Sequence, residues 1–115
     1  MTPAEALLES GKLLANPTRW CQGALARTGT GTPVAPTSKR ARKWDSVGVI
    51  YYVARCRIDD LDSTGLNAVG PALAAVSFAA GRLYNLGLVA VNDELGHEAV
   101  MACFRLAYKR MKDAP

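Results

Sequence analysis

Apolar residues that recur at helical spacing constrain the fold of this chain more than any other feature of its sequence. The clearest stripe lies in residues 98 to about 112, where apolar side chains follow one another at intervals of three and four. Its members are Val100, Cys103, Phe104, Ala107, Tyr108 and Met111. Lysine and arginine near the end of the segment suit the negative C-terminal end of a helix dipole. The pattern predicts a long amphipathic helix whose apolar face must be covered by other elements.

Three further helices are expected upstream of this one. The first follows Thr2, because a threonine three residues before Glu5 is the pattern of a capping box, and it stops at Asn16, which precedes a proline. The second is expected to begin after Pro36, with a cap at residue 37 or 38, and to extend to about residue 57. The third is expected to begin at Pro71 and to end near residues 85–87.

Residues 63–81 carry no charged side chain, and this length is close to that of a membrane-spanning helix. The run consists mostly of Ala, Gly, Ser, Thr and Asn and contains Pro71, and few of these residues favour lipid strongly. We therefore expect a loop followed by a buried core helix, and no interaction with a membrane.

The segment "TGTGTP", residues 28–33, has two interpretations. A phosphate-binding loop requires a strand before it, a helix directly after it, and either a third glycine or a Gly-Lys-Ser/Thr ending. These features are missing, and the prolines at positions 33 and 36 delay the next helix. We therefore expect a β-hairpin with a flexible tip, within about residues 19–36. Residues 88–99 are expected to form a short strand or an extended turn.

These patterns predict a mainly α protein, with four helices and a small β-hairpin after the first helix, in a single domain spanning residues 1–115. Half of the residues are hydrophobic and 21% are charged, as in ordinary globular domains. The N-terminal residues contain no apolar run typical of a secretory signal, and the three cysteines form no C-x-x-C pair. We expect a cytoplasmic protein with reduced thiols.

The net charge of +4 is distributed unevenly along the chain. Residues 27–57 contain seven Lys or Arg residues and one acid, whereas acidic residues cluster at 59–62 and 93–98. Four of the basic residues immediately precede Trp44; they are Lys39, Arg40, Arg42 and Lys43. A solvated helix start is the default interpretation of this run. As a functional surface, it would bind a protein partner, or alternatively the phosphates of a nucleic acid, with Trp44 as its aromatic member.

Several short motifs occur along the chain in a recognisable order: "RWCQGALAR", "GTPVAP", a tryptophan followed four residues later by glycine, and "NDELG". They resemble a family of small bacterial and phage proteins catalogued as a domain of unknown function, whose members carry W-x-Q-G-A-x-A, G-x-P-V-x-P, W-C-x-x-G-A and W-N-D-x-x-G motifs. The matching residues are Trp20, Gln22, Gly23, Ala24, Pro33, Val34, Pro36, Trp44, Gly48, Asn92, Asp93 and Gly96. Asp45 stands where members usually have cysteine, and Val91 where they often have tryptophan. The resemblance implies an architecture and no activity, and any chemistry of the family cysteine would be absent here.

Few residues are candidates for catalysis or metal binding. His97 is the only histidine, and no cysteine or carboxylate stands at a usual ligand spacing from it, so no metal site is expected. We expect His97 near the surface, in the first turn of the last helix. A pair of Cys21 and His97 has nothing in its favour beyond the presence of both residues.

The recognisable polar and aromatic residues have a structural and a functional interpretation. Asn92 and Asp93 are expected to cap the last helix or to form an Asx-turn; the alternative is a polar site that also contains Trp20 and Gln22. Trp20 and Trp44 are expected to be core anchors, with stacking on a partner as the alternative.

The sequence shows no catalytic constellation and no cofactor motif, so we expect a non-enzymatic interaction or regulatory protein that binds a macromolecular partner. The resemblance to phage proteins suggests that such a protein comes from a phage or mobile element, and inhibition of a host defence complex fits this class. The first alternative is nucleic-acid binding through residues 39–43. A more remote alternative is a small enzyme built around Asn92, Asp93 and Cys21. The oligomeric state is not predicted.

Overall fold

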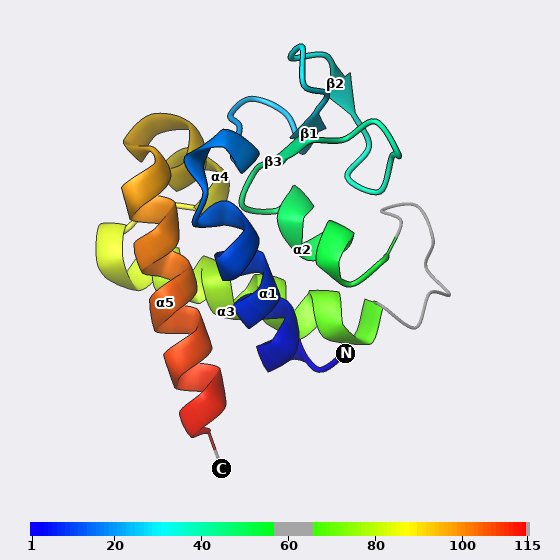
Figure 1. The fold of residues 1–115 in the computed structure, drawn as a ribbon. Coiled ribbons are helices and arrows are strands. Elements are labelled where there is room, and N and C mark those ends of the chain that lie inside the picture. The colour runs from blue at the N-terminus through cyan, green and yellow to red at the C-terminus, as the bar shows by residue number, and fades with distance from the viewer. Residues whose placement is uncertain (57–65, 115) are drawn as a thin grey trace.

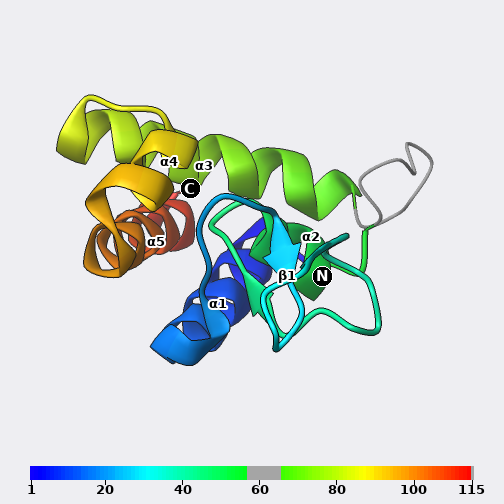
Figure 2. The ribbon, with the colours of Figure 1, turned by 90° about the horizontal axis from the view of Figure 1, so that it is seen from above.

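Three long helices form the body of the protein in the computed structural model, which describes residues 1–56 and 66–114 (Figure 1). They are α1 (Pro3–Leu14), α3 (Leu66–Tyr84) and α5 (His97–Asp113), and each packs against the other two. A short helix, α2 (Gly48–Val53), packs on α1 and α3. Figure 2 shows α3 along one side of the molecule, with α1, α2 and α5 on the same side of it. The expected mainly α fold is confirmed.

The first and last helices form as their sequences predict. Thr2 and Glu5 make the reciprocal hydrogen bonds of a capping box at the start of α1, each with a length of 3.1 Å. In α5, the apolar stripe faces the core, where Val100 and Cys103 are fully buried and Phe104 is 2% exposed. Burial of these stripes supplies most of the driving force for packing the body.

A small antiparallel sheet lies at one end of the helical body, beside α2 (Figure 1). Its strands are β1 (Ala26–Arg27), β2 (Pro33–Val34) and β3 (Lys43–Trp44), in the order β2-β1-β3. Residues 28–32 close the turn between β1 and β2, with Thr28 N donating to Thr32 O at 2.8 Å and Gly31 N donating to Thr28 O at 3.0 Å. Gly31 has a φ of +96°, which favours glycine. The expected hairpin is confirmed, and β3 adds an unexpected third strand.

The prediction of a helix from residue 37 or 38 to about 57 is wrong for most of its length. Residues 37–42 form turns, in which Ala41 N donates to Ser38 O at 3.1 Å, and the chain then enters β3. Trp44 lies opposite Ala26 of β1 in the sheet register. The basic run therefore lies on a loop and a strand, because pairing with β1 outweighs the local helical pattern.

The third helix begins at Leu66, before Pro71, which was expected at its start. Its buried face consists of small side chains; Ala72, Val76, Ala79 and Ala80 are fully buried. Pro71 is exposed inside the helix. The acidic turn, with Asp59, Asp60 and Asp62, lies outside the described residues.

The expectation of a strand or an extended turn after α3 is also wrong. The chain forms the single turn α4 (Leu88–Ala90) and then the π-helical turn η2 (Val91–Leu95). Gly96 N donates to Val91 O at 3.1 Å, and Gly96 leaves the turn with a φ of +97°. This wide turn carries Asn92 into the interior.

Among the described helices, none alone has the length and apolar character needed to cross a bilayer. The segments Asn67–Tyr84 and Leu88–Leu95 have the necessary length and apolar character only when they are taken together, and the chain bends by 67° between them.

Gly48 allows the sheet to approach α2 closely. The Leu25 carbonyl accepts a hydrogen bond of 3.1 Å from Asp45 N and lies directly against Gly48. A Cβ at position 48 would collide with this carbonyl. Because the carbonyl belongs to the backbone, it cannot move aside as the end of a flexible side chain can.

We expect Gly48→Ala to lower the free energy of unfolding by about 3 kcal/mol, the upper range for overpacking a rigid site. Urea denaturation followed by circular dichroism measures this change. Gly29→Ala is the matched control, because no atom lies within 4 Å of a Cβ at position 29. Equal stabilities of the two variants would contradict the proposed close approach.

Candidate functional site

The side-chain amide of Asn92 is fully buried and makes all four hydrogen bonds that it can form. Its Oδ1 accepts from Trp20 Nε1 at 2.8 Å and from Ser46 N at 3.0 Å. Its Nδ2 donates to Cys21 O at 3.1 Å and to Asp93 Oδ1 at 2.9 Å. The amide therefore joins three segments that are distant in the sequence. We call Asn92 and these four partners the Asn92 clasp.

Gln22 and Gly23 add an outer layer to the Asn92 clasp. Gln22 Nε2 donates to the carbonyls of Asn92 and Asp93, at 3.0 and 3.2 Å. Gly23 N donates to Asp93 Oδ1 at 3.1 Å. The structure thus brings together Trp20, Gln22, Asn92 and Asp93, the four residues of the polar cluster considered from the motifs.

Local structure positions the Trp20 side of the clasp. The 3-10 turn η1 (Pro17–Arg19) follows α1 and delivers Trp20, which forms a parallel bridge with Trp44. The Trp20 ring meets His97 edge-on, with 5.5 Å between ring centroids. His97 Nε2 lies 2.6 Å from Leu14 O, and because a carbonyl only accepts, Nε2 carries the proton. His97 thereby satisfies a carbonyl at the end of α1 from the start of α5.

The expectation that Asn92 and Asp93 cap the last helix is wrong. The residue before α5 is Gly96, and no side chain caps its amides. Asn92 instead forms hydrogen bonds with Ser46, Cys21 and Trp20, which precede it in the sequence by 46, 71 and 72 positions. The polar cluster is thus a long-range tie, and its central amide has no donor or acceptor left for a ligand.

Asp45 is the residue whose role sequence reasoning missed. Its Oδ1 accepts from Val47 N at 2.9 Å and from Gly48 N at 2.6 Å, just before α2. Burial raises the pKa of Asp45 to about 6, the two backbone amides lower it, and the nearby Asp93 raises it further. An aspartate that accepts from backbone amides two and three residues ahead forms a local side-chain-to-backbone turn, for which this residue type is well suited.

The environment of Cys21 does not activate its thiol. The side chain is 7% exposed, and its Sγ lies 3.6 Å from Ala24 O. Burial raises the pKa of the thiol to about 11; Asp45 adds to this shift, whereas Arg27 and Lys43 oppose it. Since the thiolate is the nucleophilic form, Cys21 is unreactive at neutral pH. The remote alternative, an enzyme built on Asn92, Asp93 and Cys21, would need to free groups that are engaged here.

The four basic residues 39, 40, 42 and 43 differ from Trp44 in their exposure to solvent. Lys39, Arg40 and Arg42 are exposed and Lys43 is half-buried; we call these four residues the basic loop. Trp44 is 2% exposed, its Nε1 donates to Pro36 O at 2.9 Å, and its ring packs on Tyr52. The expected core anchor therefore fits Trp44, whereas the alternative, that Trp44 belongs to an exposed binding surface, does not.

The Asn92 clasp leads to a test of stability. We expect Asn92→Asp to lower the free energy of unfolding by about 3 kcal/mol or more, because it removes two donors and buries a charge beside Asp93. Gln22→Ala is the control, and its cost should stay below about 1 kcal/mol because Gln22 is exposed. Urea denaturation of the three proteins measures both effects. If the two variants lost nearly equal amounts of unfolding free energy, the Asn92 clasp would not be the interaction that holds these segments together.

The raised pKa of Asp45 leads to a pH test. The pKa of Asp45 is raised from 3.8 to about 6 in the folded state. The stability that this shift contributes is fully present below pH 3.8 and is lost as the pH rises through about 6. Asp45→Asn keeps an oxygen acceptor and cannot ionise. We therefore expect the wild type to lose stability relative to Asp45→Asn between pH 4 and pH 7, as measured by thermal unfolding. A pH-independent difference would contradict this assignment.

The comparisons with known proteins confirm that the chain belongs to a family of unknown function, as the resemblance implied. No curated protein and no solved structure matches this chain. One family model matches residues 1–110, and its description is a family of unknown function, DUF6197. This match covers the capping box of α1, the hairpin, the Asn92 clasp and nearly all of α5. The chain belongs to the DUF6197 family of unknown function.

Proposed function

We propose that this protein is a non-enzymatic binding protein whose basic loop contacts an acidic surface of a partner protein. In this role it acts by occupying the partner's surface, and inhibition of a host complex by a phage or mobile-element protein is one such case. The proposal is carried by one observation: among the described residues, none of the four cations of the basic loop has an ion-pair partner.

The geometry of the basic loop supports a preformed surface. Arg42 Nη1 donates to the carbonyls of Lys39 and Ala41, both at 2.8 Å. Arg40 N donates to Ser38 Oγ at 3.1 Å. These bonds hold the loop backbone while the charged groups of Lys39 and Arg40 remain in solvent. A loop that is already ordered loses less conformational entropy on binding.

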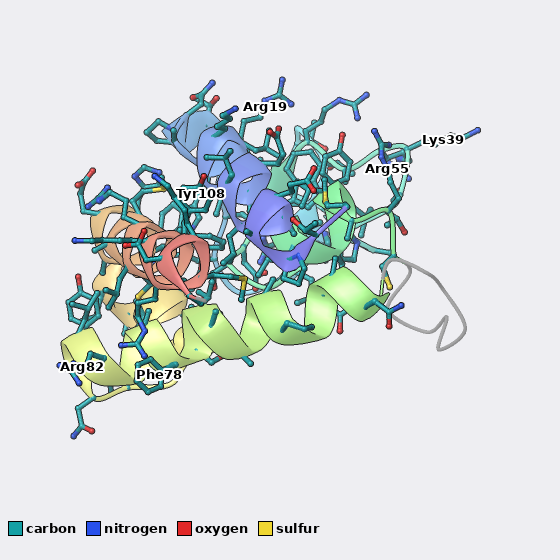
Figure 3. All side chains as sticks on the ribbon, turned by 90° about the horizontal axis from the view of Figure 1, so that it is seen from below. Arg19, Lys39, Arg55, Phe78, Arg82 and Tyr108 are labelled. Carbon is teal, nitrogen blue, oxygen red and sulfur yellow. The ribbon has the colours of Figure 1, made fainter. Side chains whose placement is uncertain are left out.

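The state of the motif residues supports a non-enzymatic role. The amide of Asn92 is saturated, the Cys21 thiol is neutral, and His97 Nε2 is bonded to Leu14 O. Within the described part of the chain, no three His, Cys, Asp or Glu side chains gather where a metal ion could bind. In contrast, Figure 3 shows Lys39 of the basic loop pointing away from the body.

Nucleic-acid binding is the second candidate, and the same exposed cations favour it. Phosphates attract lysine and arginine without any need for base contacts. However, Trp44, the aromatic ring expected beside these cations, is buried and so is not available to stack on single-stranded bases. A protein partner therefore accounts better for this surface.

We expect Lys39→Glu combined with Arg40→Glu to weaken partner binding at least about tenfold, because two attractive charges become repulsive. Arg42 is left intact, since its guanidinium holds the loop. The control is Arg19→Glu with Arg82→Glu, which reverses two exposed cations on η1 and α3. Quantitative affinity purification from host lysate compares the three proteins.

Two outcomes would overturn the proposal. Equal recovery of the same proteins by both double variants would show that the basic loop does not bind them. Recovery that disappears after nuclease treatment, together with a gel shift whose affinity falls steeply with salt, would assign the loop to nucleic acid instead.

A further inference from the structure

A second surface, away from the basic loop, lies between α1 and α5. These helices leave a groove of about 290 Å³ between them. Its apolar lining comes from Leu7, Leu8, Met101, Phe104 and Tyr108. Figure 3 places Tyr108 on the side of α5 that faces α1. This volume is at the small end of the range for ligand pockets, about 300–1,000 Å³, and suits a few side chains of a docking segment.

The floor of the groove contains a glycine that packing does not require. Gly11 lies inside α1, where glycine weakens a helix relative to alanine. Its φ is not positive, and a Cβ at this position would meet its nearest neighbour, Phe104 Cβ, at an ordinary 4.0 Å. Alanine would therefore fit the fold. The effect of glycine here is to keep the groove open.

The charges that line the groove are positive. Lys12 stands on its α1 side and Arg105 on its α5 side, and none of the described residues that line it carries a carboxylate. Lys12 also forms an exposed ion pair with Glu9 at 3.5 Å. The carboxylates of Glu5 and Glu9 line a different cleft, next to Tyr52 and Arg55.

The basic rim continues along α5. Lys109 and Lys112 follow Arg105 at intervals of four and three residues, so they lie on the same face of the helix. Both are exposed. An occupant that places acidic side chains along this rim and apolar side chains on the floor complements both parts of the groove.

We propose that the α1–α5 groove is a docking site for an amphipathic helix of a partner protein, whose apolar face is flanked by acidic side chains. A helix laid in an apolar groove presents anchors three and four residues apart. The carboxylates beside these anchors pair with Arg105 and Lys12. This inference goes beyond the function proposed for the basic loop, because it uses different elements and a partly apolar contact.

The test is selection of a displayed library of random helical peptides on the full-length protein. The selected peptides are then measured against variants by fluorescence anisotropy. Gly11→Leu fills the groove, and Gly81→Leu is its matched control, because position 81 is an exposed glycine of α3 with no atom within 4 Å. Lys12→Glu with Arg105→Glu reverses the rim, and Lys39→Glu with Arg40→Glu reports on the basic loop.

We expect the selected peptides to carry apolar residues at intervals of three and four with acidic neighbours. They should bind the wild type, Gly81→Leu and the basic-loop variant alike. Their affinity should fall at least about tenfold with Gly11→Leu and with the rim reversal. Thermal unfolding of Gly11→Leu shows that this loss occurs in a folded protein, and the rim reversal tests the groove without changing its volume.

Three outcomes would overturn the inference. The first is that no peptide is enriched, or that the enriched peptides are basic or bind Gly11→Leu unchanged. The second is loss of binding in the basic-loop variant only, which would place the peptides on the other surface. The third is a concentration-dependent dimer in sedimentation that Gly11→Leu converts to a monomer, which would identify a second copy of the chain as the occupant.

Discussion

The buried amide of Asn92 is the interaction on which the rest of the architecture depends. It satisfies the Trp20 indole, the Ser46 amide and the Cys21 carbonyl at once, and each of these belongs to a segment that has little regular structure. The small sheet has strands of two residues, too short to be stable alone. The Asn92 clasp attaches this sheet to the helical body and leaves no polar group of the amide unpaired.

The elements that could be predicted from sequence are those whose signals are local. The capping box of α1 and the apolar stripe of α5 depend only on neighbouring residues, and both were predicted correctly. The segment before Gly48 and the turn at Val91 could not be predicted in this way. Their conformations depend on β1 and on Trp20, partners that are distant in the sequence.

The candidate site shows the same division. The motif order grouped Trp20, Gln22, Asn92 and Asp93, but residue types alone do not show that Asn92 is saturated by long-range bonds. Asp45 was noted only as a departure from the family, yet its carboxylate accepts hydrogen bonds from the backbone amides of Val47 and Gly48 at the start of α2. The two proposed binding surfaces use other side chains, which are mostly exposed and less distinctive, whereas the motif residues Trp20, Trp44 and Asn92 contribute to the scaffold.

The position of Asn92 along the chain also determines when the protein can acquire its final form. Its long-range hydrogen bonds join residues that are 46 to 72 positions apart. Such contacts form slowly, because the chain loses conformational entropy before the favourable interactions are made. During synthesis, α1 and the hairpin leave the ribosome well before η2 exists. The hairpin therefore stays unanchored until η2 has been synthesised, and the Asn92 clasp cannot close before that point.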